Sequence, residues 1–119
     1  MGNAARTPSG GVNLPETFTS SFATFGEWLN SYQRISYNSR VYLFSKYKTA
    51  TIKIDRFTSS GVGNGYYVLL NKDGQEIKSS RITSKGSISV DVRNVYCIEF
   101  RSSSESNIAL FAGTVTAVK

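Results

Sequence analysis

Three stretches of the chain alternate, wholly or in large part, between apolar and polar residues, and this alternation constrains the fold more than any other feature. The stretches are TATIKID at residues 49–55, GSISVDV at 86–92 and VYCIEFR at 95–101. Successive side chains of a β-strand point to opposite faces, so each stretch predicts a strand with one buried and one solvent-facing side. Asp55, Asp91 and Glu99 are then expected to face solvent.

Further strands are expected in segments rich in β-branched and aromatic residues, which suit a pleated surface. These segments are RVYLFS (40–45), YYVLLN (66–71), QEIKSSRI (75–82) and NIALFAGTVTAV (107–118). Short turn sequences separate them, such as NKDG at 71–74, where Gly74 suits a positive φ. We therefore predict an all-β protein, an antiparallel, jelly-roll-like β-sandwich of about seven or eight strands.

One N-terminal segment carries a different pattern. Phe18, Phe22, Phe25, Leu29 and Tyr32 recur at helical spacing, which favours a short helix packed against the sheet over an irregular strand. Residues 1–13 are small, polar and rich in glycine, and we expect them to form a flexible arm. Residues 14–119 are expected to form a single domain.

The glycines of SSGVGNGYY, residues 59–67, fall at alternate positions, as glycines do in some loops that bind phosphate. Tyr66 stands where the dinucleotide-binding pattern needs its last glycine, and the residues that follow read as a strand rather than a helix. We interpret this segment as a bend that leads into a strand.

The chain has no histidine and one cysteine, Cys97, which removes most catalytic and metal chemistry. No Ser–His–Asp or Cys–His arrangement, zinc site or internal disulfide is available, and Cys97 is expected to be a small buried residue. A glycoside hydrolase with paired carboxylates from Asp55, Asp91 and Glu99 is the remaining enzymatic option. Because we expect these carboxylates to be solvated, we predict that the protein is not an enzyme and has no cofactor or metal.

Positive charge is concentrated in one part of the chain. The net charge is +6, and residues 28–54 contain five basic residues and no acidic one. Aromatic residues are interleaved with these bases, and the combination suits polyanions, sugar rings or an anionic membrane surface. The residues that we expect to bind a ligand are Trp28, Arg34, Tyr37, Arg40, Lys46, Tyr47 and Lys48. A solvated basic face with its tyrosines in the core is the alternative.

Residues 50–117 contain the run ATIKID, YYVLLNKDGQEI, GSISVDV, VYCIEFRSSS and IALFAGTVTA. This run resembles small β-sandwich modules of secreted bacterial proteins, of the pre-peptidase C-terminal and jelly-roll types. The resemblance implies a secreted sandwich with a binding or accessory role. It assigns no functional residue, and it does not extend to the first 48 residues.

We therefore predict a small secreted protein that binds an anionic polymer or glycan of the bacterial cell envelope without catalysis. Teichoic acid is the favoured polymer because it presents phosphate and sugar together. A membrane-active or antimicrobial protein, and a protein-binding inhibitor or immunity module, are the alternatives. Nucleic acid is not favoured because no recognition motif is present. The N-terminus lacks the apolar segment of a signal peptide, so secretion would require a mature chain, and a cytoplasmic protein is the alternative.

Overall fold

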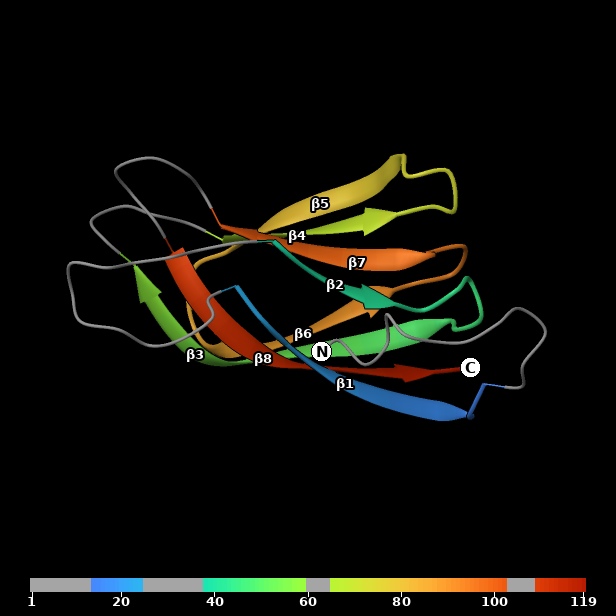
Figure 1. The fold of residues 1–119 in the computed structure, drawn as a ribbon. Coiled ribbons are helices and arrows are strands. Elements are labelled where there is room, and N and C mark those ends of the chain that lie inside the picture. Colours follow the sequence, from blue (N-terminus) through green and yellow to red (C-terminus); the bar gives the residue numbers. More distant parts are fainter. Residues whose placement is uncertain (1–13, 25–37, 60–64, 103–108) are drawn as a thin grey trace.

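The computed structural model describes residues 14–24, 38–59, 65–102 and 109–119. These residues form two four-stranded antiparallel sheets that pack face to face (Figure 1). The first sheet contains, in order, β1 (Thr17–Ala23), β8 (Ala109–Val118), β3 (Thr49–Ser59) and β6 (Gly86–Asp91). The second contains β2 (Ser39–Tyr42), β7 (Cys97–Ser102), β4 (Gly65–Leu70) and β5 (Glu76–Ile82). The predicted all-β sandwich is confirmed.

The strand pairs are nested around one central hairpin, as they would be if a single long hairpin were folded into two sheets. β4 pairs with β5, β3 with β6, β2 with β7 and β1 with β8, and every pair is antiparallel. The turn at residues 71–74 is the tip of this hairpin, and the pairs β3–β8 and β4–β7 complete the two sheets. This nested pairing is the jelly-roll arrangement, as the sequence predicts.

The apolar side of each alternating stretch forms the core between the sheets. In β3, Ile52 and Ile54 are buried and Lys53 between them is exposed. In β6, Val90 is buried and Ser89 before it is exposed. Burying one such aliphatic side chain contributes about 1.5–3 kcal/mol, so the registers that keep these residues inside are strongly favoured. The bulkiest fully buried side chains are Phe100, Phe111, Leu43, Ile52, Leu69, Ile82 and Ile98.

The expected N-terminal helix is wrong over the part of it that the structure describes. Residues Thr17–Ala23 form β1, which pairs with β8 along its whole length. Phe18 and Phe22 are four residues apart, a spacing that places them on one side of a strand as well as of a helix. The ring of Phe22 packs on that of Phe100 in the opposite sheet, with centroids 3.6 Å apart. Burial against the second sheet therefore decides in favour of the strand.

Three other expectations fall on residues that lie outside the described ones. They concern the remainder of the helical pattern in residues 25–37, the arm at 1–13, and the glycine-rich bend at 60–64. The strand expected directly after that bend is present as β4.

The outer faces of the two sheets differ in chemistry. On the first sheet, the register aligns Thr19, Thr116, Thr51 and Ser89 in one row across all four strands, so this face presents mainly hydroxyl groups. On the second sheet, Arg40, Tyr42 and Glu99 share the outer face with apolar residues. The second sheet therefore holds the candidate site.

Candidate functional site

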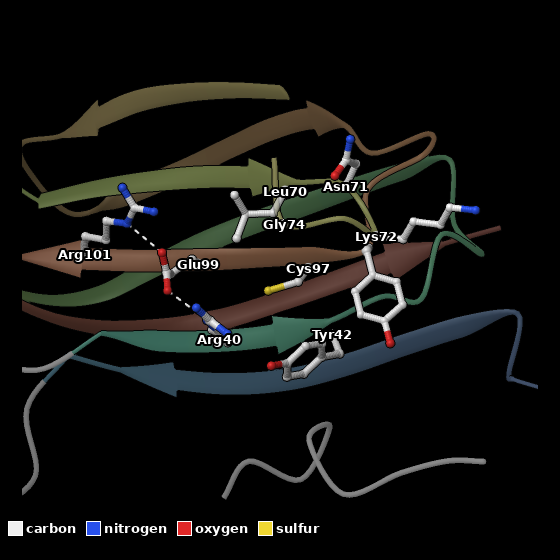
Figure 2. Close-up of a pocket in the computed structure, with 10 residues that line it drawn as sticks. Arg40, Tyr42, Leu70, Asn71, Lys72, Gly74, Cys97, Glu99 and Arg101 are labelled. Atoms are coloured by element: carbon white, nitrogen blue, oxygen red, sulfur yellow. Dashed lines mark hydrogen bonds and ion pairs between the residues drawn. The ribbon is translucent and has the colours of Figure 1, made fainter. Parts of the chain in front are cut away.

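A pocket of about 280 Å³ lies on the outer face of the second sheet. It extends over β2 and β7 toward the turn between β4 and β5, which contributes Asn71 and Lys72 (Figure 2). Arg40, Glu99 and Arg101 lie together at one end, as the dashed contacts in Figure 2 show. Aromatic residues of β2 and of the segment before β7 lie at the other end.

Glu99 binds both arginines at its end of the pocket. Its Oε2 accepts a hydrogen bond from Nε of Arg40 at 2.8 Å, and its Oε1 accepts one from Nε of Arg101 at 2.6 Å. The Glu99 side chain is 4% exposed, whereas those of Arg40 and Arg101 are 53% and 43% exposed. A buried carboxylate thus holds two half-exposed guanidinium groups in place, and both use Nε for the contact.

The electrostatics of this trio favour the charged forms of Glu99 and Arg40. Burial by itself would raise the pKa of Glu99, but the hydrogen bonds from Arg40 and Arg101 outweigh burial, and the pKa is lowered. Hydrogen bonds to Tyr42 and to Glu99 raise the pKa of Arg40. The trio therefore carries one net positive charge at the surface.

The expectation that Glu99 faces solvent is wrong. β7 is an inner strand of its sheet, between β2 and β4, so the longer side chains of its neighbours cover its outer face. The register places Arg40 directly opposite Glu99, and a buried charge is tolerated where it is paired and hydrogen-bonded. The alternating pattern identifies which side of the strand Glu99 occupies, but not what covers that side.

Cys97 lies on the same side of β7 as Glu99 and forms an apolar part of the pocket with Leu70 and the neighbouring Val68. It is a buried free thiol, as the sequence predicts. Burial raises the pKa of Cys97 to about 11, so the thiol is protonated at neutral pH. Its contribution to the pocket is apolar surface rather than a thiolate nucleophile.

Three aromatic rings gather at the other end of the site. Tyr42, Phe44 and Tyr96 contact one another pairwise, with ring centroids 5.9, 5.9 and 5.4 Å apart. Phe44 and Ser45 have φ angles of 56° and 59°, as in a type I′ turn, which normally uses glycine or asparagine there. A bulky residue with such a φ costs about 1–3 kcal/mol and persists only where its surroundings hold it. Packing against Tyr42 and Tyr96 supplies that support.

The backbone also holds this turn against the segment before β7. The N–H groups of Leu43 and Phe44 both donate to the carbonyl oxygen of Tyr96, at 2.8 and 3.0 Å. The N–H of Tyr96 in turn donates to the carbonyl oxygen of Leu70 at 2.8 Å. The aromatic end of the pocket is therefore built on three segments that are distant in sequence.

The structure describes four of the seven predicted ligand-binding residues, and only one of these four lines the pocket. That residue is Arg40. Lys46 and Lys48 are exposed in the connection between β2 and β3. Tyr47 is 3% exposed, and its hydroxyl donates to the carbonyl oxygen of Pro15 at 2.9 Å. Its ring lies in the core and offers no face for stacking, so we do not retain Tyr47 as a binding residue.

The other three predicted residues, Trp28, Arg34 and Tyr37, lie outside the described residues. Sequence reasoning missed Tyr42, Tyr96 and Arg101 as pocket residues. Tyr42 lies within the basic and aromatic window and Arg101 follows Glu99 by two residues, so each carried a partial signal. Their convergence depends on the pairing of β2 with β7.

The three carboxylates considered for glycoside hydrolysis do not come together. Asp55 and Asp91 belong to the first sheet and form ion pairs with Lys53 at 3.9 Å and Arg93 at 3.3 Å, whereas Glu99 belongs to the second. Within the described ranges, no group of three or more His, Cys, Asp or Glu residues is placed to hold a metal ion. That same part of the chain contains no helix with the length and apolar character needed to cross a membrane.

Comparison with known proteins assigns the chain to no family. No family model matches it, and no curated protein matches it significantly. A chain from the structure of Bacillus endospore appendages, described as a novel family of disulfide-linked pili, is 14% identical, with a TM-score of 0.47 and coverage of 86% of this chain and 84% of that chain. A chain from the crystal structure of accessory secretory protein 1,2 and 3 in Streptococcus pneumoniae is 8% identical, with a TM-score of 0.46 and coverage of 92% and 91%. Neither likeness is close enough to carry a functional argument, and the resemblance to pre-peptidase C-terminal modules stays a prediction.

Proposed function

We propose that this protein is a secreted, non-catalytic module that binds an anionic polymer or glycan of the bacterial cell envelope, with teichoic acid as the favoured polymer. The main support is the pocket on the outer face of the second sheet. It combines two guanidinium groups, held by one buried carboxylate, with a group of aromatic rings.

The two ends of the pocket suit two parts of such a ligand. A guanidinium group donates paired hydrogen bonds to phosphate or carboxylate oxygens, and an aromatic ring offers a flat apolar surface to a sugar ring. Because Glu99 already orients Arg40 and Arg101, less side-chain freedom is lost when a ligand binds. The net charge of +6 adds long-range attraction to a polyanion.

Binding rather than turnover is supported by the groups around the pocket. The Cys97 thiol is protonated at neutral pH because burial raises its pKa to about 11. Glu99 already binds two arginines, and neither Asp55 nor Asp91 shares its sheet. Within the described residues, the pocket therefore offers hydrogen-bond donors and rings rather than an acid and a base.

Cosedimentation of the purified protein with Gram-positive cell walls tests the proposal. The walls are used with and without their teichoic acid, across a salt series. We expect the wild-type protein to sediment only with walls that retain the polymer, and to be released as salt rises because exposed charges are screened. Arg40→Gln should weaken binding roughly tenfold, since hydrogen bonds to charged groups are the strong ones. Arg93→Gln removes an equal charge on the turn after β6 and should bind like the wild type.

Binding that is equal with and without teichoic acid, or equal in the two variants, would contradict the proposal. Release of dye from anionic vesicles would point instead to a membrane-active protein. Recovery of a saturable one-to-one complex with an acidic protein would point to an inhibitor or immunity module.

A further inference from the structure

A row of three side chains crosses the outer face of the second sheet beside the pocket. Tyr66 of β4 is paired with Arg81 of β5 on one side and with Arg101 of β7 on the other. Directly opposed residues of neighbouring strands share a face, and neighbouring strands lie about 4.8 Å apart. Tyr67 follows Tyr66 in the chain and Ile82 follows Arg81, and both side chains point to the opposite face, into the core. The row itself is therefore on the outer face, with an arginine on each side of a tyrosine.

This row has an excess of positive charge. Arg81 is exposed and, among the described residues, forms no ion pair. Glu99 lies in the adjacent row, but it already binds Arg40 and Arg101. Tyr66 is half-buried, so part of the residue is accessible. Because Arg101 belongs both to the row and to the pocket, the two are continuous on the sheet.

We propose that Arg81, Tyr66 and Arg101 form a phosphate-binding subsite for the phosphodiester groups of the envelope polymer, an inference that rests on the proposed function. Two guanidinium groups can share one anion, as Arg40 and Arg101 share Glu99, but a carboxylate presents its two oxygens in a single plane. A phosphate group is tetrahedral and presents oxygens in several directions, so guanidinium groups on both sides of it can donate to it at once. Tyr66 offers its ring to the sugar or polyol that adjoins the phosphate.

The subsite also indicates a path for the polymer. The aromatic end of the pocket, the arginines bound by Glu99 and the Arg81–Tyr66–Arg101 row follow one another along the outer face. A polymer that alternates sugar or polyol with phosphate would meet rings and guanidinium groups in turn. The outer face of the first sheet, with its rows of hydroxyl groups, offers no comparable sequence of groups among the described residues.

The test compares ligands that share negative charge but differ in its chemistry. The full-length protein is titrated with isolated poly(glycerol phosphate) teichoic acid, with polygalacturonate as a carboxylate polymer of matched length, and with phosphatidylglycerol vesicles as a lipid source of glycerol phosphate. We expect the wild type to prefer teichoic acid over both. Arg81→Gln should weaken teichoic acid binding roughly tenfold and reduce the preference over polygalacturonate. Arg81→Lys keeps the charge but not the planar fork, so its affinity for teichoic acid should lie between those of the wild type and Arg81→Gln. Arg93→Gln is the matched control.

The outcomes separate this inference from the proposed function. If Arg40→Gln weakens the binding of teichoic acid but Arg81→Gln does not, the subsite is overturned and the proposed function stands. Equal wild-type affinity for polygalacturonate would overturn the assignment to phosphate. Tighter binding to the vesicles would assign the subsite to a lipid headgroup and overturn the polymer as its ligand. Failure of the wild type to bind any of the three would overturn both.

Discussion

Glu99 links the candidate site to the stability of the protein through its protonation. It is a buried acid on an outer sheet face, and it holds Arg40 and Arg101 through Oε2 and Oε1. These hydrogen bonds lower its pKa in the folded state despite burial. The ionised form is therefore bound more favourably in the folded protein than in the unfolded chain.

Replacing this acid with its neutral isostere should give a destabilisation that depends on pH. Glu99→Gln is expected to lower the free energy of unfolding by about 1–3 kcal/mol at pH 7, because two charge-assisted hydrogen bonds are weakened. The contribution of ionised Glu99 is fully present above its unfolded-state pKa of about 4.3 and is lost as the pH falls through the lower folded-state pKa. The difference between wild type and variant should therefore shrink below about pH 4. Urea unfolding at several pH values measures it, and a difference that stays constant down to pH 2 would contradict this account.

The pairing of β3 with β8 depends on close approach at one glycine. The register of these strands shifts between Ile54 and Arg56, and Gly113 is the partner of Ile54 just before the shift. A Cβ atom at Gly113 would overlap the backbone carbonyl oxygen of Lys53. β3 pairs with β8 over a greater length than with β6, and β8 also pairs with β1 at the sheet edge. A displacement at Gly113 therefore affects three strands.

Adding one methyl group at this point should therefore destabilise the first sheet. Gly113→Ala is expected to cost about 3 kcal/mol or more, because backbone atoms cannot rotate away as a side chain can. Thr114→Ala, which removes atoms from the outer face next to it, should change stability by about 0.5 kcal/mol or less. Thermal or urea unfolding of the two variants measures the effect. Similar stabilities for both would show that the strands can separate at Gly113 without loss.

At the scale of the whole fold, the first and the last described strands pair with each other. β1 and β8 come from opposite ends of the described chain and pair from Thr17↔Val118 to Ala23↔Ala112. Phe22 on β1 packs on Phe100 of the second sheet and edge-on against Phe111 of β8. β1 thus covers the edge of β8 and joins the first sheet to the core, and an uncovered edge of this kind invites association with other chains.

Two truncations test the domain boundary that the sequence predicts. Removal of residues 1–13 should leave the melting temperature unchanged within error, since residues 14–119 are expected to form the whole domain. Removal of residues 1–23 should abolish cooperative unfolding or cause aggregation, because losing a buried Phe alone costs about 3–5 kcal/mol and a domain is stable by only about 5–15 kcal/mol. Circular dichroism and size-exclusion chromatography report both outcomes. A folded, monomeric chain that begins at residue 24 would contradict the role given to β1.

The candidate site was only partly predictable, and the reason is visible in single residues. Arg40, which lines the pocket, is predicted as a binding residue from the density of basic and aromatic residues around it, a local property. Tyr47 belongs to the same window but lies in the core, since density does not state which way a side chain points. The sequence does not show that Glu99 and Arg101 line a pocket with Arg40, because Arg40 is 59 residues from Glu99 in the chain.

The sequence by itself determined the all-β class, most of the strands and the absence of histidine chemistry, because alternation, turn residues and composition are local properties of the chain. It did not determine β1, since a spacing of four residues suits both a helix and a strand. Only the tertiary structure decided that β1 is a strand, that Glu99 is buried, and that Arg40, Arg101 and the rings of Tyr42 and Tyr96 share one face. The physical reason is that pairing and register between distant strands set the neighbours of each side chain, and those neighbours decide burial and charge pairing.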